Sequence, residues 1–142
     1  MMERTLLMIK PDAVRAGHIG EILTALERES HWHIRGIRMK CFSRDEAESF
    51  YAVHRERPFF PDLVTFILSG PVVGILLEGD GVIARIREWI GATDPAKAAP
   101  GTIRARFGSN IQENAVHASD SPESAQREIP FFFGEEEVHP CG

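Results

Sequence analysis

Cysteine is scarce in this sequence, and long apolar runs are missing from it. Cys41 and Cys141 are the two cysteines of the 142 residues, and neither has CxxC spacing or a histidine-rich set of neighbours. The sequence therefore predicts no disulfide framework, no zinc site and no dedicated set of metal ligands. No stretch approaches the roughly 18 apolar residues of a membrane span, and the first residues carry charge rather than an apolar leader. We expect a soluble, cytoplasmic protein with no membrane partner.

An excess of basic charge is also missing. The formal net charge is -5 and the pI is about 5.7. Extended nucleic-acid surfaces rely on clustered lysine and arginine, so no specific nucleic-acid partner is expected. With 43% hydrophobic residues, a chain of this length is sufficient for one compact core but short for two. We expect a single domain over residues 1–142, in which about 135–142 form a short surface tail.

Three stretches in the first half show clear periodicity. Residues 5–9 are an apolar run that ends at Lys10 and Pro11, and proline cannot continue the ladder of a central strand, so a buried strand ends at Lys10. Apolar residues over 19–26 recur at helical spacing and predict an amphipathic helix. Residues 37–41 alternate, with their apolar side chains on one face, and predict a strand paired with the first.

The second half begins with a helix signal and continues with a central strand. Ser43 and Glu46 have the spacing of a capping box, which predicts a helix start. Residues 72–77 are continuously apolar and predict a strand buried on both faces. Residues 82–90 carry a second amphipathic stripe, and Arg87 falls outside that stripe.

The irregular segment over residues 91–109 gathers basic side chains. Its glycines and prolines forbid a continuous helix or strand, and a loop of this length in a compact domain is often functional. Together with Arg87 just before it, the segment carries Thr93, Arg104 and Arg106. A guanidinium is a permanently charged, planar fork of donors that matches phosphate oxygens. This is the densest candidate phosphate site in an otherwise acidic chain.

His117 lies where a strand end meets a helix start. Residues 114–117 suit the end of a strand, and residues 120–122 suit a helix N-terminus, whose free amides favour anionic groups. Imidazole attacks phosphorus when one ring nitrogen is free and an acceptor holds the other. Glu128, about two turns into the helix, is the candidate acceptor, with Ser119 bridging. A purely structural histidine near a turn remains the other interpretation of these residues.

The run Asn114-Ala-Val-His117-Ala-Ser119-Asp120-Ser121 resembles the active-site signature of nucleoside diphosphate kinases. Matching segments follow the family's order over most of the chain, at residues 4–12, 57–60, 69–73, 91–95 and 100–104. Each segment alone is a weak signal, but together they are very specific. The resemblance implies transfer of the γ-phosphoryl group of a nucleoside triphosphate to a nucleoside diphosphate, in a ping-pong reaction through a phosphohistidine.

The resemblance also implies roles for individual residues. The catalytic set is His117, Glu128, Ser119, Lys10 and Tyr51, and the substrate-binding set is Lys10, His54, Phe59, Leu63, Arg87, Thr93, Arg104, Ile111 and Asn114. Within the first set, Tyr51 orients Lys10, while Glu128 and Ser119 orient His117. Stacking of the base on an aromatic ring tolerates every base, so base specificity is expected to be broad.

Phosphate and sugar contacts follow from the same resemblance. Arg87, Thr93 and Arg104 are expected to bind the phosphates, and Lys10 and Asn114 the sugar. Mg²⁺ is expected to bridge the phosphates and to enter with the nucleotide, because the chain shows no carboxylate cage for it.

The expected fold is α/β (α+β), a ferredoxin-like sandwich. Short strands and two long amphipathic helices suggest a β-α-β-β-α-β core, with one four-stranded antiparallel sheet and helices packed on one face. The strand order rests on the resemblance, which also implies a homo-oligomer, either a tetramer or a hexamer built from dimers. Two departures from the family are one extra residue near residues 29–33 and Ala118 where many relatives have glycine.

Three other functions stay open. A nucleotide-binding regulatory module of the same fold would need neither His117 nor Glu128. A nucleic-acid-binding domain would carry aromatic and basic residues on its sheet, whereas these strands are mostly aliphatic. An inactive relative would keep the pocket and lose the reaction.

Overall fold

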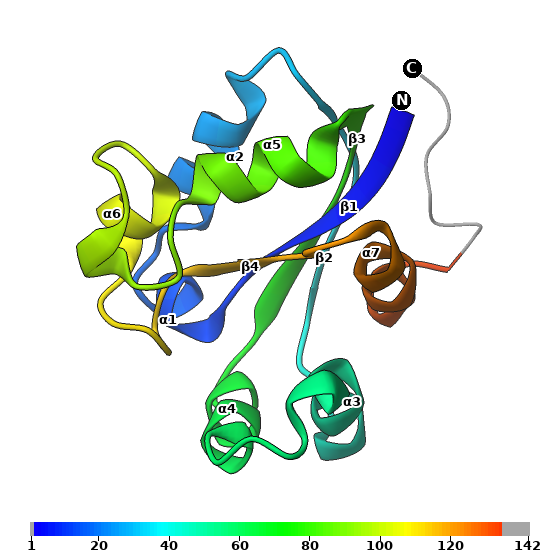
Figure 1. The fold of residues 1–142 in the computed structure, drawn as a ribbon, viewed down its shortest axis with the longest axis vertical. Helices are drawn as coiled ribbons and strands as arrows, with labels where there is room; N and C mark the ends of the chain where they lie inside the picture. Colours follow the sequence, from blue (N-terminus) through cyan, green and yellow to red (C-terminus); the bar gives the residue numbers. More distant parts are fainter. Residues whose placement is uncertain (1, 135–142) are drawn as a thin grey trace.

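One four-stranded antiparallel sheet organises the protein. The computed structural model describes residues 2–134, and the tail expected over residues 135–142 lies outside them. The strands are β1 (Met2–Ile9), β2 (His33–Lys40), β3 (Val72–Asp80) and β4 (Val116–Ala118). They lie in the order β2-β3-β1-β4 (Figure 1). The predicted ferredoxin-like sheet is therefore confirmed.

Helices cover both faces of this sheet (Figure 1). The described helices are α1 (Pro11–Arg15), α2 (Ile19–Glu27), α3 (Arg44–Phe50), α4 (Phe60–Ile67), α5 (Val82–Ile90), α6 (Ile103–Phe107) and α7 (Pro122–Glu128). On one face, α2 and α5 pack against Leu7 and Ile9 of β1. On the other, α3 and α4 pack against Leu6 and Met8. The expectation of helices on one face is wrong, because successive apolar side chains of β1 point to opposite sides and both sides are covered.

The edge strand β2 differs from its prediction in two ways. It pairs with β3 and not with β1, which lies between β3 and β4. Ile37 and Met39 stand opposite Ile75 and Val73 in the register, yet each is 53% exposed. The helices on that face therefore leave β2 uncovered. The alternating pattern of apolar residues predicted the strand correctly but not the strand with which it pairs.

The local signals for helices are largely correct. Ser43 and Glu46 form the predicted capping box at the start of α3. Ser121 caps α7 by accepting from the backbone N–H of Ser124. The long segment after α5 contains a helix, α6, that the sequence did not predict; the Thr102 side chain caps it. No helix within residues 2–134 is long and apolar enough to cross a membrane.

Candidate active site

His117 lies in the middle of β4, which pairs with β1 so that His117 stands opposite Met8. Two aromatic side chains from the end of α3 set the plane of its ring. Phe50 meets the imidazole at a centroid distance of 5.3 Å and Tyr51 at 6.2 Å, both edge to face. The His117 side chain remains 25% exposed. The ring is therefore fixed in orientation and still open to a ligand.

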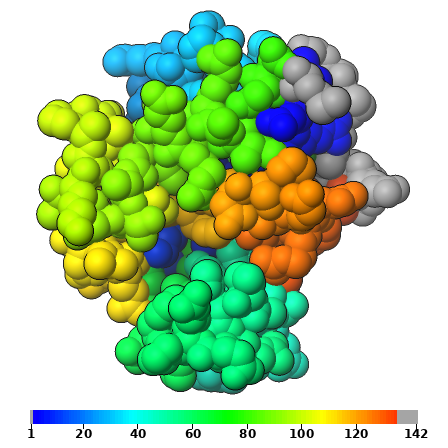
Figure 2. Space-filling model, in the orientation of Figure 1, coloured from blue at the N-terminus to red at the C-terminus, as the bar shows by residue number. Residues whose placement is uncertain are grey.

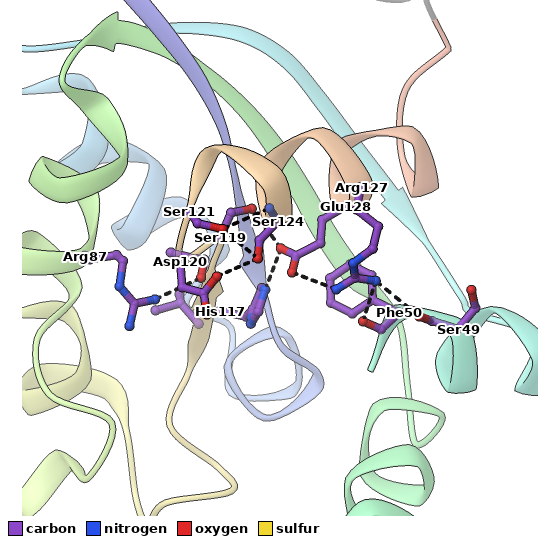
Figure 3. Close-up of polar contacts among 12 residues, drawn as sticks. Ser49, Phe50, Arg87, His117, Ser119, Asp120, Ser121, Ser124, Arg127 and Glu128 are labelled. Carbon is purple, nitrogen blue, oxygen red and sulfur yellow. Dashed lines mark hydrogen bonds and ion pairs between the residues drawn. The ribbon is translucent and has the colours of Figure 1, made fainter. Parts of the chain in front are cut away.

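A buried carboxylate holds one nitrogen of this ring. Nε2 of His117 lies 2.8 Å from Oε1 of Glu128, and Ser119 Oγ donates to the same oxygen at 2.8 Å (Figure 3). Glu128 is only 4% exposed. Burial would raise the pKa of its carboxyl, but the hydrogen bonds from His117 and Ser119 outweigh it and lower the pKa below its ordinary value. The Glu128 contact has the predicted geometry, although Ser119 shares the carboxylate and does not bridge the two groups.

Two arginines are anchored beside the histidine through the backbone of β4. Arg104 Nη2 donates to the carbonyl of Val116 at 2.9 Å, and Arg87 Nη1 donates to that of Ala118 at 3.2 Å. These carbonyls belong to the residues on either side of His117. Burial, followed by the charge of Arg87, lowers the pKa of Arg104 to about 10, so the Arg104 guanidinium is still cationic at neutral pH.

A cavity of about 380 Å³ lies next to these arginines. Arg87, Thr93 and Arg104 all line it, so the structure brings the three predicted phosphate ligands together. The Thr93 carbonyl accepts from Asn114 Nδ2 at 3.0 Å, which ties the long segment after α5 to the residues before β4. Arg106 does not join this group and lines a separate surface cavity.

Lys10 directly follows the last residue of β1, so the strand stops where the sequence predicts, but the Lys10 side chain is almost completely buried. Nζ donates to the carbonyl of Gln112 at 2.7 Å and to Asn114 Oδ1 at 3.0 Å, and it lies over the ring of Phe66. Burial lowers the pKa of Lys10 to about 8, against the opposing charge of Asp12. Lys10 and Asn114, predicted to act on the same sugar, are therefore in direct contact.

Tyr51 does not make the contact expected of it. Its hydroxyl is buried and has no hydrogen-bond partner among the described residues, and Lys10 bonds elsewhere. Burial raises the pKa of this hydroxyl. The ring packs against His117 instead. The prediction that Tyr51 orients Lys10 is wrong for this structure.

The predicted base-binding residues gather around the start of α4. Phe59 is 49% exposed, and its ring lies 5.4 Å from that of His54. Leu63 follows one turn later and is partly buried. The exposed Ile111 adjoins Gln112, whose side chain donates to the Asp62 carbonyl of α4. Figure 2 shows a hollow between the α3–α4 part (teal and green) and the yellow and orange segments that contain α6 and α7.

Comparisons with known proteins identify the class of site. A model described as nucleoside diphosphate kinase matches residues 3–138. The chain belongs to the nucleoside diphosphate kinase family. The enzyme of Chlamydia abortus is 55% identical over 137 residues, 96% of each chain, and that of Thermus thermophilus is 53% identical over 96% of this chain and 99% of its own. This similarity over the full length shows that the chain has nucleoside diphosphate kinase activity.

Solved structures of the family have the same fold. The Aquifex aeolicus nucleoside diphosphate kinase superimposes with a TM-score of 0.94 at 50% identity, covering 97% of this chain and 99% of that one. A halophilic nucleoside diphosphate kinase from Halobacterium salinarum, in complex with CDP, gives 0.94 at 39% identity, covering 100% and 94%. Both likenesses extend over the whole site.

The two departures from the family pattern are accommodated without disturbing the site. Ala118 is 2% exposed, and its methyl group packs in the core on the α2 and α5 face. The turn over residues 29–33 leads into β2. Within this turn, the Trp32 side chain donates to the Leu26 carbonyl and its ring meets that of Trp89 edge to face. The extra residue there is separated in the sheet from β4 by β3 and β1.

Arg127 contacts the site in a way that the sequence did not predict. Its guanidinium donates to the carbonyls of Ser49 and Phe50 at 3.2 and 3.1 Å and lies 3.4 Å from Oε2 of Glu128 (Figure 3). It therefore connects the second oxygen of the Glu128 carboxylate to the end of α3, which carries Phe50 against His117. Two of its partners are backbone carbonyls distant in sequence, so no residue pattern signals the contact.

Proposed function

We propose that the chain transfers the γ-phosphoryl group through a phosphohistidine on Nδ1 of His117. In the first step Nδ1 attacks the γ-phosphorus, and the bond from that phosphorus to the β–γ bridging oxygen breaks to release the nucleoside diphosphate. In the second step a terminal oxygen of the acceptor diphosphate attacks the same phosphorus and the P–N bond breaks. The observation that carries this proposal is the 2.8 Å contact between His117 Nε2 and the buried Glu128.

That contact supports Nδ1 as the nucleophile. A neutral imidazole has one N–H and one lone pair, and a carboxylate accepts but does not donate. The proton therefore belongs on Nε2, and the lone pair on Nδ1 is free to react. As phosphorylation makes the ring more positive, the ionised carboxylate stabilises the intermediate.

Fixed positive charge carries most of the remaining catalysis in this proposal. The transferred group spreads negative charge over its oxygens, and preorganised donors stabilise that charge without rearranging. Arg87, Thr93 and Arg104 line one cavity, and the two arginines are bonded to carbonyls beside His117. Donor and acceptor nucleotides place the same phosphates on this set, so one site serves both steps.

Mg²⁺ belongs to the substrate in this account. No group of three or more potential ligands among histidine, cysteine, aspartate and glutamate occurs in residues 2–134. Mg²⁺ keeps several waters and is commonly bound through substrate phosphates. The nucleotide therefore brings the ion, which neutralises phosphate charge.

The sugar and the base occupy the other end of the proposed site. Lys10 and Asn114 bind the sugar hydroxyls, and the base stacks between Phe59 and Leu63, with His54 and Ile111 nearby. These contacts read no base-specific group, so all common nucleotides are accepted. The CDP in the Halobacterium salinarum structure supports a nucleoside diphosphate as ligand of this class of site.

We also propose a homo-oligomer, a tetramer or a hexamer built from dimers. Strand β2 is an edge of the described sheet, and an edge presents unpaired backbone groups. Ile37 and Met39 add exposed apolar surface to it. Sedimentation analysis decides between the two assemblies, and a monomer at micromolar concentration would contradict both.

The test of the catalytic proposal is a labelling experiment. Protein incubated with Mg²⁺ and γ-labelled ATP, then freed of nucleotide, is expected to carry an acid-labile, base-stable label that GDP and CDP both discharge. His117→Gln is expected to bind nucleotide and take no label. A wild-type protein that binds nucleotide without label would instead favour the regulatory module.

A further inference from the structure

Ala115 has an unusual backbone conformation next to the active site. Its φ of 76° is the one positive value among the non-glycine residues of 2–134. The N–H of Val116 donates to the Asn114 carbonyl at 2.9 Å, which closes a three-residue γ-turn around Ala115. A γ-turn with positive φ is rare and strained for a residue with a Cβ. Such a conformation persists only where the surroundings hold it.

The segment after β1 holds both polar groups of Ala115. Asp12 Oδ2 accepts from the Ala115 N–H at 3.0 Å, and the Lys10 N–H donates to the Ala115 carbonyl at 2.9 Å. Ala115 is completely buried, so water does not replace either partner. The Lys10 bond comes from the backbone, which leaves the Asp12 carboxylate as the side chain that fixes the turn.

The turn connects two parts of the active site. Before it, Asn114 contacts Lys10 Nζ and the Thr93 carbonyl. After it, β4 begins at Val116 and carries His117. A change in φ at Ala115 would rotate β4 relative to Asn114, and so move the nucleophile relative to the sugar-binding pair.

We propose that Asp12 is a positioning residue for phosphoryl transfer, whose carboxylate holds the Ala115 turn and thereby sets His117 relative to Asn114 and Lys10. This inference rests on the proposed roles of those three residues.

The surroundings of Asp12 support a functional reason for the carboxylate. Its second oxygen, Oδ1, is buried and has no hydrogen-bond partner among the described residues. Burial raises the pKa of Asp12, with the hydrogen bond from Ala115 and the charge of Lys10 opposing the shift. A buried carboxylate oxygen without a hydrogen-bond partner is unfavourable for folding, and such groups are concentrated at functional sites.

The experiment is a double-mutant cycle on Asp12 and Ala115. Asp12→Ala removes the acceptor, and we expect kcat per folded enzyme to fall about tenfold or more at saturating nucleotide, because small misplacements of reacting groups have effects of this size. Glycine adopts positive φ without strain. In the Ala115→Gly background the loss of Asp12 should therefore lower kcat much less. Equal losses in both backgrounds would overturn the proposal.

Two further variants separate positioning from stability. Asp12→Asn keeps an oxygen acceptor without the charge and should retain most of the activity. If Asp12→Asn folds but its kcat is at least tenfold lower than that of the wild type, the proposal is overturned. This test applies even if Asp12→Ala does not fold. Glu3→Ala is the matched control, because the Glu3 carboxylate also accepts from one backbone N–H, that of Ile83, at the far end of β1. It should lower the melting temperature and leave kcat unchanged.

The outcome is independent of the labelling experiment. If the wild-type protein turned over without forming a label, the phosphohistidine mechanism would be excluded. If Asp12→Ala and the wild type had equal kcat, the positioning role of Asp12 would be excluded and the phosphohistidine mechanism would be unaffected.

Discussion

Nε2 of His117 lies 2.8 Å from Oε1 of Glu128, and this contact distinguishes the two nitrogens of the ring. The nitrogen held by the carboxylate carries the proton, and the other one is left as the nucleophile. Glu128 is itself held by Ser119 through one oxygen and by Arg127 through the other. The reactive tautomer therefore depends on a chain of contacts that extends to the end of α3.

Glu128→Gln tests the first of these contacts. The amide of glutamine can present N–H to the ring and favour the wrong tautomer, so the rate of phosphoenzyme formation should fall on the order of a hundredfold. Rapid-quench labelling measures this rate. Glu123→Gln, on the exposed first turn of α7, is the matched control and should label at the wild-type rate. Unchanged labelling of Glu128→Gln would contradict the assignment.

Arg127→Ala tests the second contact. The Arg127 side chain is 41% exposed, so solvent weakens the ion pair, and the loss of the two bonds to the end of α3 should lower the free energy of unfolding by about 1 kcal/mol. Phosphoenzyme formation should slow several-fold, because Glu128 and the Phe50 carbonyl both lose their contact with the Arg127 guanidinium. Urea unfolding and rapid-quench labelling measure the two effects.

Arg44→Ala is the comparison for Arg127→Ala. Arg44 is 65% exposed and reaches Glu48 only at 4.0 Å, so its removal should change neither quantity. If Arg127→Ala labelled at the rate of Arg44→Ala, Arg127 would have no role in catalysis.

Local signals in the sequence were sufficient for much of this architecture. The capping box at Ser43, the helix start at Ser121 and the end of β1 at Lys10 depend on neighbouring residues alone, and each is present. The strand with which β2 pairs, and the packing of α3 and α4 on the second face of the sheet, depend on contacts between segments distant in sequence. Periodicity carries no information on such contacts, and both predictions were wrong.

The site shows the same division between local and distant contacts. Glu128 was found by counting turns of a helix from Pro122 towards His117. Two partners of Arg127 are backbone carbonyls, and the Tyr51 ring packs against His117 while its hydroxyl makes no hydrogen bond to Lys10. Neither arrangement follows from residue type or spacing.

Lys10 should make nucleotide binding sensitive to alkaline pH. Burial lowers its pKa from 10.5 to about 8, so the free protein loses this positive charge above pH 8. Nucleotide affinity should fall as pH rises through that value, because an anionic ligand loses a cation. Calorimetric titration with MgADP between pH 7 and 9, below the pKa of Arg104, measures the effect, and the affinity of Lys10→Arg should stay constant over this range.

The stability of the free protein should change in the opposite direction. Between pH 8 and 10.5 the unfolded chain keeps the Lys10 proton while the folded chain has lost it, so the unfolded state binds more protons. The contribution of Lys10 to stability therefore rises with pH in this window. Lys10→Met should lack the rise, and identical pH profiles of stability for the two proteins would contradict the shifted pKa.

Phe59→Ala tests the stacking of the base. Loss of one aromatic platform should weaken binding about tenfold for every nucleoside diphosphate, since each base has a π-face. Competition titrations with ADP, GDP and CDP compare the three affinities. Val53→Ala, which removes a side chain that is 75% exposed nearby in sequence, should leave them unchanged. A loss confined to one base would show hydrogen-bonded recognition.

The most direct test of the account is nuclear magnetic resonance of the phosphoenzyme made with ¹⁵N-labelled histidine. Phosphorus should couple to Nδ1 of one histidine whose Nε2 keeps its proton, and the signal should be missing from His117→Gln. Coupling to Nε2, or a phosphorylated histidine that persists in His117→Gln, would contradict the assignment of the nucleophile and of Glu128 as the group that orients it.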